Sequence, residues 1–185
     1  MHTTISLRTR AVLGAAAALA AVALILVIGA SAAVAAGPNV GFGFNARAIK
    51  GAPTGAVRLT GGGSFGASTG FVHAGGGFSC TSSVSQGPLA GCQTGEGVRW
   101  DSAELLPSTP FKCTGAASEA LKTASTDGET VALRSDFYRA GDGNDESFTA
   151  NMFVSAKDLA PDIAGVQNAW VQGVGCATAT AHFSS

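Results

Sequence analysis

The sequence predicts one all-β domain, an antiparallel β-barrel or a two-sheet sandwich, preceded by an N-terminal hydrophobic helix. Three observations support this prediction. Residues 37–185 hold 24 of the 26 glycines of the chain, and glycine weakens helices. Between the glycines, apolar and polar residues alternate with a period of two, which is typical of half-buried strands. Turn residues separate these stretches at short intervals, as expected for an antiparallel sheet.

Residues 1–36 have the pattern of an export signal. Arg8 and Arg10 precede an uncharged run over residues 11–36, which ends in small residues. We expect cleavage after Ala35 or Ala36, which would leave residues 37–185 as one secreted domain. The run is also long enough for a helix that spans a bilayer. An uncleaved membrane anchor with the β domain outside is therefore the alternative, and membrane contact is expected only through this segment.

The charge of residues 37–185 argues against a nucleic-acid partner. Two of the 11 Lys and Arg residues lie in the export segment, so nine remain against 12 Asp and Glu. The sequence contains no basic cluster, whereas nucleic-acid binding depends on Lys and Arg at the phosphates.

Several segments are predicted to be strands, in the following order. Residues 40–49 place Phe42, Phe44, Ala46 and Ala48 on one face, and residues 56–60 alternate Val57 and Leu59 with polar residues. Residues 130–138, 147–155 and 166–176 continue the pattern, and a last strand is expected over residues 176–183.

A repeated glycine triplet predicts a hairpin over residues 60–79. Gly61-Gly62-Gly63 is followed by Gly75-Gly76-Gly77, and residues 66–70 between them form a natural turn. Glycine within strands often marks a bend or a bulge. Because a closed sheet needs such bends, the triplets favour the barrel over the sandwich.

Helical patterns are weak. Asp101 is expected to cap a short turn over residues 102–106, which Pro107 limits. Residues 116–124 favour a helix by propensity, although the strands expected on both sides could override that preference.

The four cysteines predict two disulfides, because the expected compartment is oxidising. Three pairings are possible, and we favour Cys80 with Cys92 and Cys113 with Cys176. The first pair would close a bend at Gly87-Pro88. A zinc site is disfavoured because no C-x-x-C pair is present.

Two motifs and two histidines are the candidates for catalysis or cofactor binding. Residues 66–70 match the G-x-S-x-G motif of hydrolases around Ser68, but no helical pattern follows, so a turn is expected. Residues 41–46 resemble part of a dinucleotide fingerprint, but no acidic residue precedes Glu96. His73 and His182 could act as bases, although the sequence shows no partner for either. We therefore predict no catalytic residue and no cofactor.

The densest polar cluster is residues 141–146. Its oxygen-bearing side chains are weak candidates for a calcium site, and a solvated turn is the preferred interpretation. The candidates are Asp142, Asn144, Asp145 and Glu146.

Residues 57–65 and 136–146, with the sequences V-R-L-T-G-G-G-S-F and D-F-Y-R-A-G-D-G-N-D-E, resemble segments of exported actinobacterial proteins that carry no assigned activity. The resemblance covers most of residues 37–185. It implies a secreted glycine-rich β domain and supplies no catalytic residue.

These observations lead to one preferred function and two alternatives. The preferred hypothesis is a non-enzymatic secreted domain that binds a small apolar ligand or a component of the envelope or extracellular space. One alternative is a small barrel isomerase or cyclase that uses His73 inside a closed cavity. The other is a protease inhibitor whose disulfide-tethered loop, residues 81–91, would be exposed and rigid.

Overall fold

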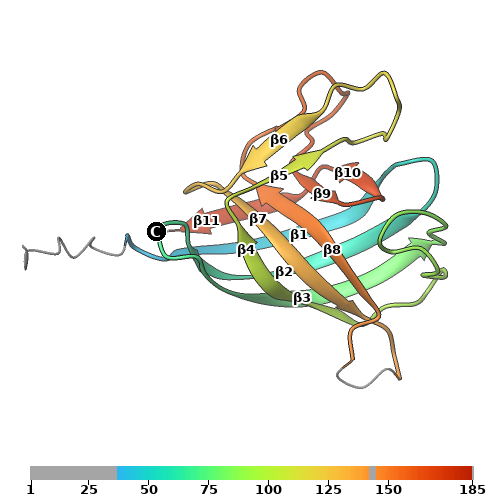
Figure 1. The fold of residues 1–185 in the computed structure, drawn as a ribbon, viewed down its shortest axis with the longest axis horizontal. Coiled ribbons are helices and arrows are strands. Elements are labelled where there is room, and N and C mark those ends of the chain that lie inside the picture. Colours follow the sequence, from blue (N-terminus) through green and yellow to red (C-terminus); the bar gives the residue numbers. More distant parts are fainter. Residues whose placement is uncertain (1–36, 142–144, 185) are drawn as a thin grey trace, which may run out of the picture. The chain divides into compact units, whose positions relative to one another are not determined.

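The computed structural model describes residues 37–141 and 145–184. Residues 36–185 form one compact unit. Its described part contains strands and turns and no helix, which confirms the all-β prediction (Figure 1). The export segment, with its expected hydrophobic helix and cleavage site, lies outside the described residues and stays a prediction.

Eleven strands are present in the described part of the chain. They are β1 (Val40–Gly51), β2 (Ala56–Gly66), β3 (Phe71–Ser82), β4 (Arg99–Leu106), β5 (Ser108–Phe111), β6 (Lys122–Ser125), β7 (Thr130–Tyr138), β8 (Phe148–Ser155), β9 (Ala169–Val171), β10 (Gly175–Ala177) and β11 (Thr180–Ser184).

The main sheet closes into a barrel. Its strand order is β10-β9-β8-β7-β4-β3-β2-β1-β11, and an additional pairing joins β10 to β1. Lys50 lies opposite Cys176 in this closing pair, and all pairings of the sheet are antiparallel. The preference for a barrel over a sandwich is therefore confirmed. Strands β5 and β6, which lie between β4 and β7 along the chain, form a separate hairpin.

A bulge in β1 changes which side chains face the interior. Ala46 pairs with Leu59 and Ile49 pairs with Val57, so two residues of β1 lie opposite Arg58 alone. A bulge shifts the alternation of the strand by one position. Ile49 is consequently buried, and Ala48, which the sequence pattern placed on the inner face, is exposed.

The glycine hairpin is confirmed, and its inner positions make room for Trp100. Gly61 pairs with Gly76, and Gly76 pairs with Trp100. A Cβ on Gly61 would lie 2.8 Å from Cζ2 of Trp100. The indole is fully buried, and its ring centroid lies 6.0 Å from that of Phe44. Glycines on two adjacent strands thus leave space that a large aromatic ring from β4 fills.

A second, smaller core lies outside the barrel. Ala132, Phe153, Trp170 and Cys176 occupy successive partner positions on β7 to β10 and face outward. The β5–β6 hairpin covers them, with Phe111 packing edge-on against Phe153 at 4.7 Å between ring centroids. The outer surface of β7–β10 is therefore occupied by the protein's own chain.

Both expected disulfides are present, Cys80–Cys92 and Cys113–Cys176. The second disulfide joins the end of the β5 segment to β10 and so fixes the small core to the barrel. Two disulfides are compatible with an extracellular location.

One local prediction was wrong, and one alternative that the sequence left open is decided. Residues 102–106 belong to β4, where they pair with β7, so Asp101 caps no helical turn. Residues 116–124 do not form a helix, because β6 begins at Lys122 and pairs with β5. In this segment Ala124 is fully buried in the small core, so tertiary packing overrides the local helix preference.

Candidate binding surface on the outer wall

The residues considered for catalysis lie apart from any enclosed site. Ser68 is in the β2–β3 turn, where its hydroxyl accepts a hydrogen bond from the Gly37 N–H at 3.1 Å. Strand β3 follows, in place of the helix that a nucleophile turn requires. His73 and His182 are both exposed. The isomerase hypothesis required His73 to point into a closed cavity, and its side chain lies on the outside.

The acidic segment gives no metal site in the part of the chain that is described. Asp142 and Asn144 lie outside that part, and Asp145 and Glu146 are exposed. Among the described residues, no three His, Cys, Asp or Glu side chains lie close enough to hold a metal ion. The calcium hypothesis at this turn stays untested.

The loop tethered by Cys80–Cys92 packs against one end of the barrel. Val84 and Leu89 are buried and belong to the barrel core. The Val84 N–H bonds to the Cys92 carbonyl oxygen at 2.9 Å, and the Gly91 N–H bonds to the Val84 carbonyl oxygen at 2.8 Å. The loop is therefore compact, with Val84 and Leu89 buried in the core, and this form gives little support to an inhibitor loop.

The outer surface of β1–β3 differs from that of β7–β10, because glycine and polar residues form most of it, whereas the β5–β6 hairpin packs on the apolar outer residues of β7–β10. Gly43, Gly62 and Gly75 are successive cross-strand partners at its centre. We call this surface the glycine wall. It comprises Gly43, Asn45, Arg47, Lys50, Arg58, Thr60, Gly62, Ser64, His73, Gly75, Gly77 and Ser79.

Some of these glycines are required by the fold and others are not. A Cβ on Gly75 would lie 2.8 Å from Asp101 Oδ1 and 3.0 Å from the Trp100 carbonyl oxygen. On Gly43 the nearest atom would be 3.9 Å away, which is an ordinary contact. Packing therefore does not explain Gly43, although glycine lowers the stability of a strand.

The glycine wall carries positive charge, and the segment of the sequence that forms it contains no acidic residue. Residues 37–95 contain Arg47, Lys50 and Arg58 and no Asp or Glu, whereas residues 96–185 contain all 12 acidic residues. All three cationic side chains are exposed, and none forms an ion pair with a described residue. The separation of basic and acidic residues along the chain is a property of the sequence. The net charge summed over residues 37–185 does not reveal it.

Cations elsewhere in the domain are mostly paired. Lys122 lies 3.0 Å from Asp162, and Lys157 lies 2.7 Å from Glu129. Arg99 lies 3.2 Å from Asp101 and stacks over Tyr138. Within the described residues, the glycine wall therefore holds three of the five Lys and Arg side chains that form no ion pair, and the other two are Lys112 and Arg134.

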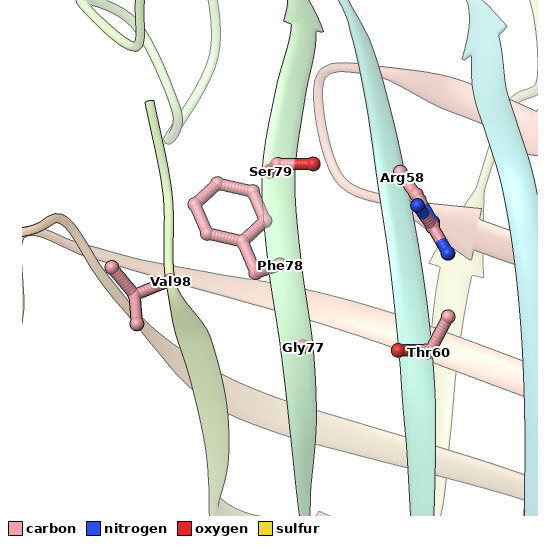
Figure 2. Close-up of a pocket in the computed structure, with 6 residues that line it drawn as sticks. All are labelled: Arg58, Thr60, Gly77, Phe78, Ser79 and Val98. Atoms are coloured by element: carbon pink, nitrogen blue, oxygen red, sulfur yellow. The ribbon is translucent and has the colours of Figure 1, made fainter. Parts of the chain in front are cut away.

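A hollow of about 170 Å³ lies at the edge of the wall, over the β2–β3 seam (Figure 2). In Figure 2 the Ser79 hydroxyl points from β3 toward β2, and the Thr60 hydroxyl points from β2 toward β3, whereas the Arg58 guanidinium extends over β2 on the side away from Ser79. None of these three groups has a hydrogen-bond partner among the described side chains. The lining residues are Arg58, Thr60, Gly77, Phe78, Ser79 and Val98.

This arrangement suits an oxyanion. A guanidinium and two hydroxyls can donate hydrogen bonds to phosphate, sulfate or carboxylate oxygens. The floor at Gly77 has no side chain, so such a group can approach the backbone closely. The Thr60 position is held from within the barrel, because its carbonyl oxygen accepts the Trp100 indole N–H at 2.9 Å.

No family model, curated protein or solved structure matches the chain. The resemblance to exported actinobacterial proteins accordingly stays a prediction. Within the described residues, no helix is both long enough and apolar enough to cross a membrane.

Proposed function

We propose that this protein is a non-catalytic binding module, exported by residues 1–36, that recognises an anionic component of the cell envelope or extracellular space through the glycine wall. The observation that carries the proposal is the segregation of charge. Arg47, Lys50 and Arg58 stand unpaired among the described residues of a surface whose strands contain no acidic residue. Complementary charge speeds encounter and selects a partner of opposite sign.

The filled interior favours binding on the outside of the barrel. Phe42, Phe65, Trp100 and Phe137 are buried in the core, and Phe65 packs edge-on against the rings of Phe42 and Phe183. The ring that the β10–β1 pairing closes runs through eight strands, with β11 beside β1, and the interior of an eight-stranded barrel is just wide enough for its own side chains. A ligand inside this barrel would have to displace these rings.

Export is part of the same proposal. The two disulfides suit an oxidising compartment, and residues 1–36 supply the expected signal. The partner would then be a component outside the cytoplasm, such as an anionic surface polymer.

The test compares two variants with the same change in net charge. In the wall variant, Arg47, Lys50 and Arg58 are each replaced by Gln. In the control variant, Lys112, Arg134 and Lys157 are replaced by Gln. The control residues lie outside the wall, on β7 and in the segments after β5 and β8. Binding of the purified protein to immobilised polyphosphate and to neutral dextran is measured at several salt concentrations.

We expect the wild type to bind polyphosphate but not dextran. The wall variant should lose about 10–100-fold in affinity, because three exposed ion pairs contribute roughly 0.5–1 kcal/mol each. The control variant should bind as the wild type does. Equal losses in both variants would show that net charge alone drives binding and would contradict the proposal.

A further inference from the structure

A second hollow adjoins the glycine wall on the side of the closing pair β1–β10. It has a volume of about 300 Å³ and lies over the Cys113–Cys176 disulfide. Ala48 and Ile163 contribute apolar side chains to its lining, whereas the side chain of Ala177 belongs to the barrel core. We call it the disulfide hollow. Ligand pockets begin at about this volume and are lined mainly by apolar groups.

The uncharged polar side chains of the disulfide hollow are already hydrogen-bonded within the chain. The Thr114 hydroxyl donates to Glu119 Oε2 at 2.6 Å, and the Thr178 hydroxyl donates to the Val166 carbonyl oxygen at 2.7 Å. The Gln167 amide donates to the Ala164 carbonyl oxygen at 2.8 Å. These groups therefore offer few donors to a ligand, and the apolar part of the lining is left for contact.

Lys50 is the one charged residue of the lining. It is exposed and forms no ion pair with a described residue. The neighbouring carboxylates are engaged elsewhere: Glu119 and Asp162 lie 3.4 and 3.0 Å from the Lys122 ammonium, respectively. Asp158 accepts the Ala160 and Gln167 N–H groups, each at 3.0 Å.

An apolar hollow with one unpaired cation at its edge fits a ligand with an apolar body and one acidic group. We propose that the disulfide hollow binds the hydrocarbon part of a single anionic amphiphile, a long-chain carboxylate, whose acid group pairs with Lys50. This inference rests on the proposed function, since it names an anionic ligand at the border of the glycine wall. Lys50 pairs with Ala56, two residues before Arg58, so cationic side chains continue from the hollow onto the wall.

The test uses a fluorescent long-chain fatty acid below its micelle concentration and the matching long-chain alcohol. Two variants change the site at exposed positions: Lys50→Glu reverses the charge, and Ala48→Trp fills the hollow. The control for Lys50→Glu is Arg134→Glu on β7, and the control for Ala48→Trp is Ala90→Trp in the loop tethered by Cys80–Cys92. Both control positions are also exposed. Circular dichroism and urea unfolding establish that every variant is folded before binding is measured.

We expect the fatty acid to bind the wild type and both controls with the same affinity. Lys50→Glu should weaken binding of the acid by about fivefold or more while leaving the alcohol unchanged. Ala48→Trp should weaken binding of both ligands. Absence of fatty-acid binding, or unchanged affinity in Ala48→Trp, would overturn the inference.

Polyphosphate binding by the same preparations separates this inference from the proposed function. If the wild type binds polyphosphate but not the fatty acid, the inference fails and the proposed function stands. If the wild type binds the fatty acid, with the expected losses in both variants, but not polyphosphate, the amphiphile site stands and the proposal that the glycine wall binds anions fails.

Discussion

The indole N–H of Trp100 donates a hydrogen bond to the carbonyl oxygen of Thr60, 2.9 Å away, although β3 lies between their strands. The bond can span β3 because Gly61 and Gly76 have no side chains beneath the ring. A buried indole N–H requires such a partner. The bond therefore links the barrel core to a residue whose hydroxyl lies in the surface hollow.

Substitution of Gly61 tests this packing. We expect Gly61→Ala to lower the free energy of unfolding by about 1–3 kcal/mol, as overpacked cores do, because the new Cβ would clash with the Gly75 carbonyl oxygen and would lie 2.8 Å from Trp100 Cζ2. Urea denaturation provides the measurement. Gly43→Ala is the control, and it should be neutral or stabilising because its Cβ meets nothing closer than 3.9 Å. Equal destabilisation of the two variants would refute the packing argument.

The two disulfides should contribute unequally. Cys113–Cys176 closes a separation of 63 residues and Cys80–Cys92 one of 12. Chain-entropy arguments give about 4 kcal/mol for the longer loop and about 3 kcal/mol for the shorter one. Paired Cys→Ala variants, compared by urea unfolding without reductant, should follow this order. A larger loss from the Cys80–Cys92 variant would contradict it.

Glu119 should make stability depend on pH in acid. Burial by itself raises its pKa, but hydrogen bonds from the Thr114 hydroxyl, the Cys113 and Thr114 N–H groups and Lys122 lower the pKa to about 2, from 4.5. A depressed carboxyl pKa stabilises the fold above its unfolded value, and the contribution is lost as the pH falls toward the folded value.

The matched variant is Glu119→Gln, which cannot ionise. The difference in free energy of unfolding between wild type and Glu119→Gln should reach up to about 3 kcal/mol near pH 6 and shrink as the pH falls from 4.5 to 2. Denaturant unfolding across this range measures it. A difference that stays constant with pH would show that the carboxylate charge is not what stabilises the loop.

Local patterns predicted much of the fold. The alternation of apolar and polar residues predicted β2 and β7, and the glycine triplets predicted the β2–β3 hairpin. Both patterns could be recognised because they involve residues that are close together in the sequence. The bulge in β1 was not predictable, since it is defined by which residues of β2 lie opposite Ala46 and Ile49. Strand β4 was missed for the same reason: its residues are stabilised by pairing with β7, far along the chain.

The candidate binding surface was predictable only in part. The absence of acidic residues before Glu96 is a property of the sequence. The placement of Arg58, Thr60 and Ser79 around one hollow is not, because it depends on the register of β2 against β3. The disulfide hollow brings together Ala48, Cys113, Ile163 and Cys176 from four distant segments, which no local pattern could indicate.

The central claim, that the glycine wall binds anions, is tested most directly by mapping the contact. Backbone amide chemical shifts of the isotope-labelled protein are recorded by NMR during a titration with short-chain polyphosphate. We predict saturable shifts concentrated at Arg47, Arg58, Thr60, Gly77 and Ser79, with β7 and β8 unchanged. Shifts spread evenly over the domain, shifts confined to β7 and β8, or no saturable shifts would contradict the account.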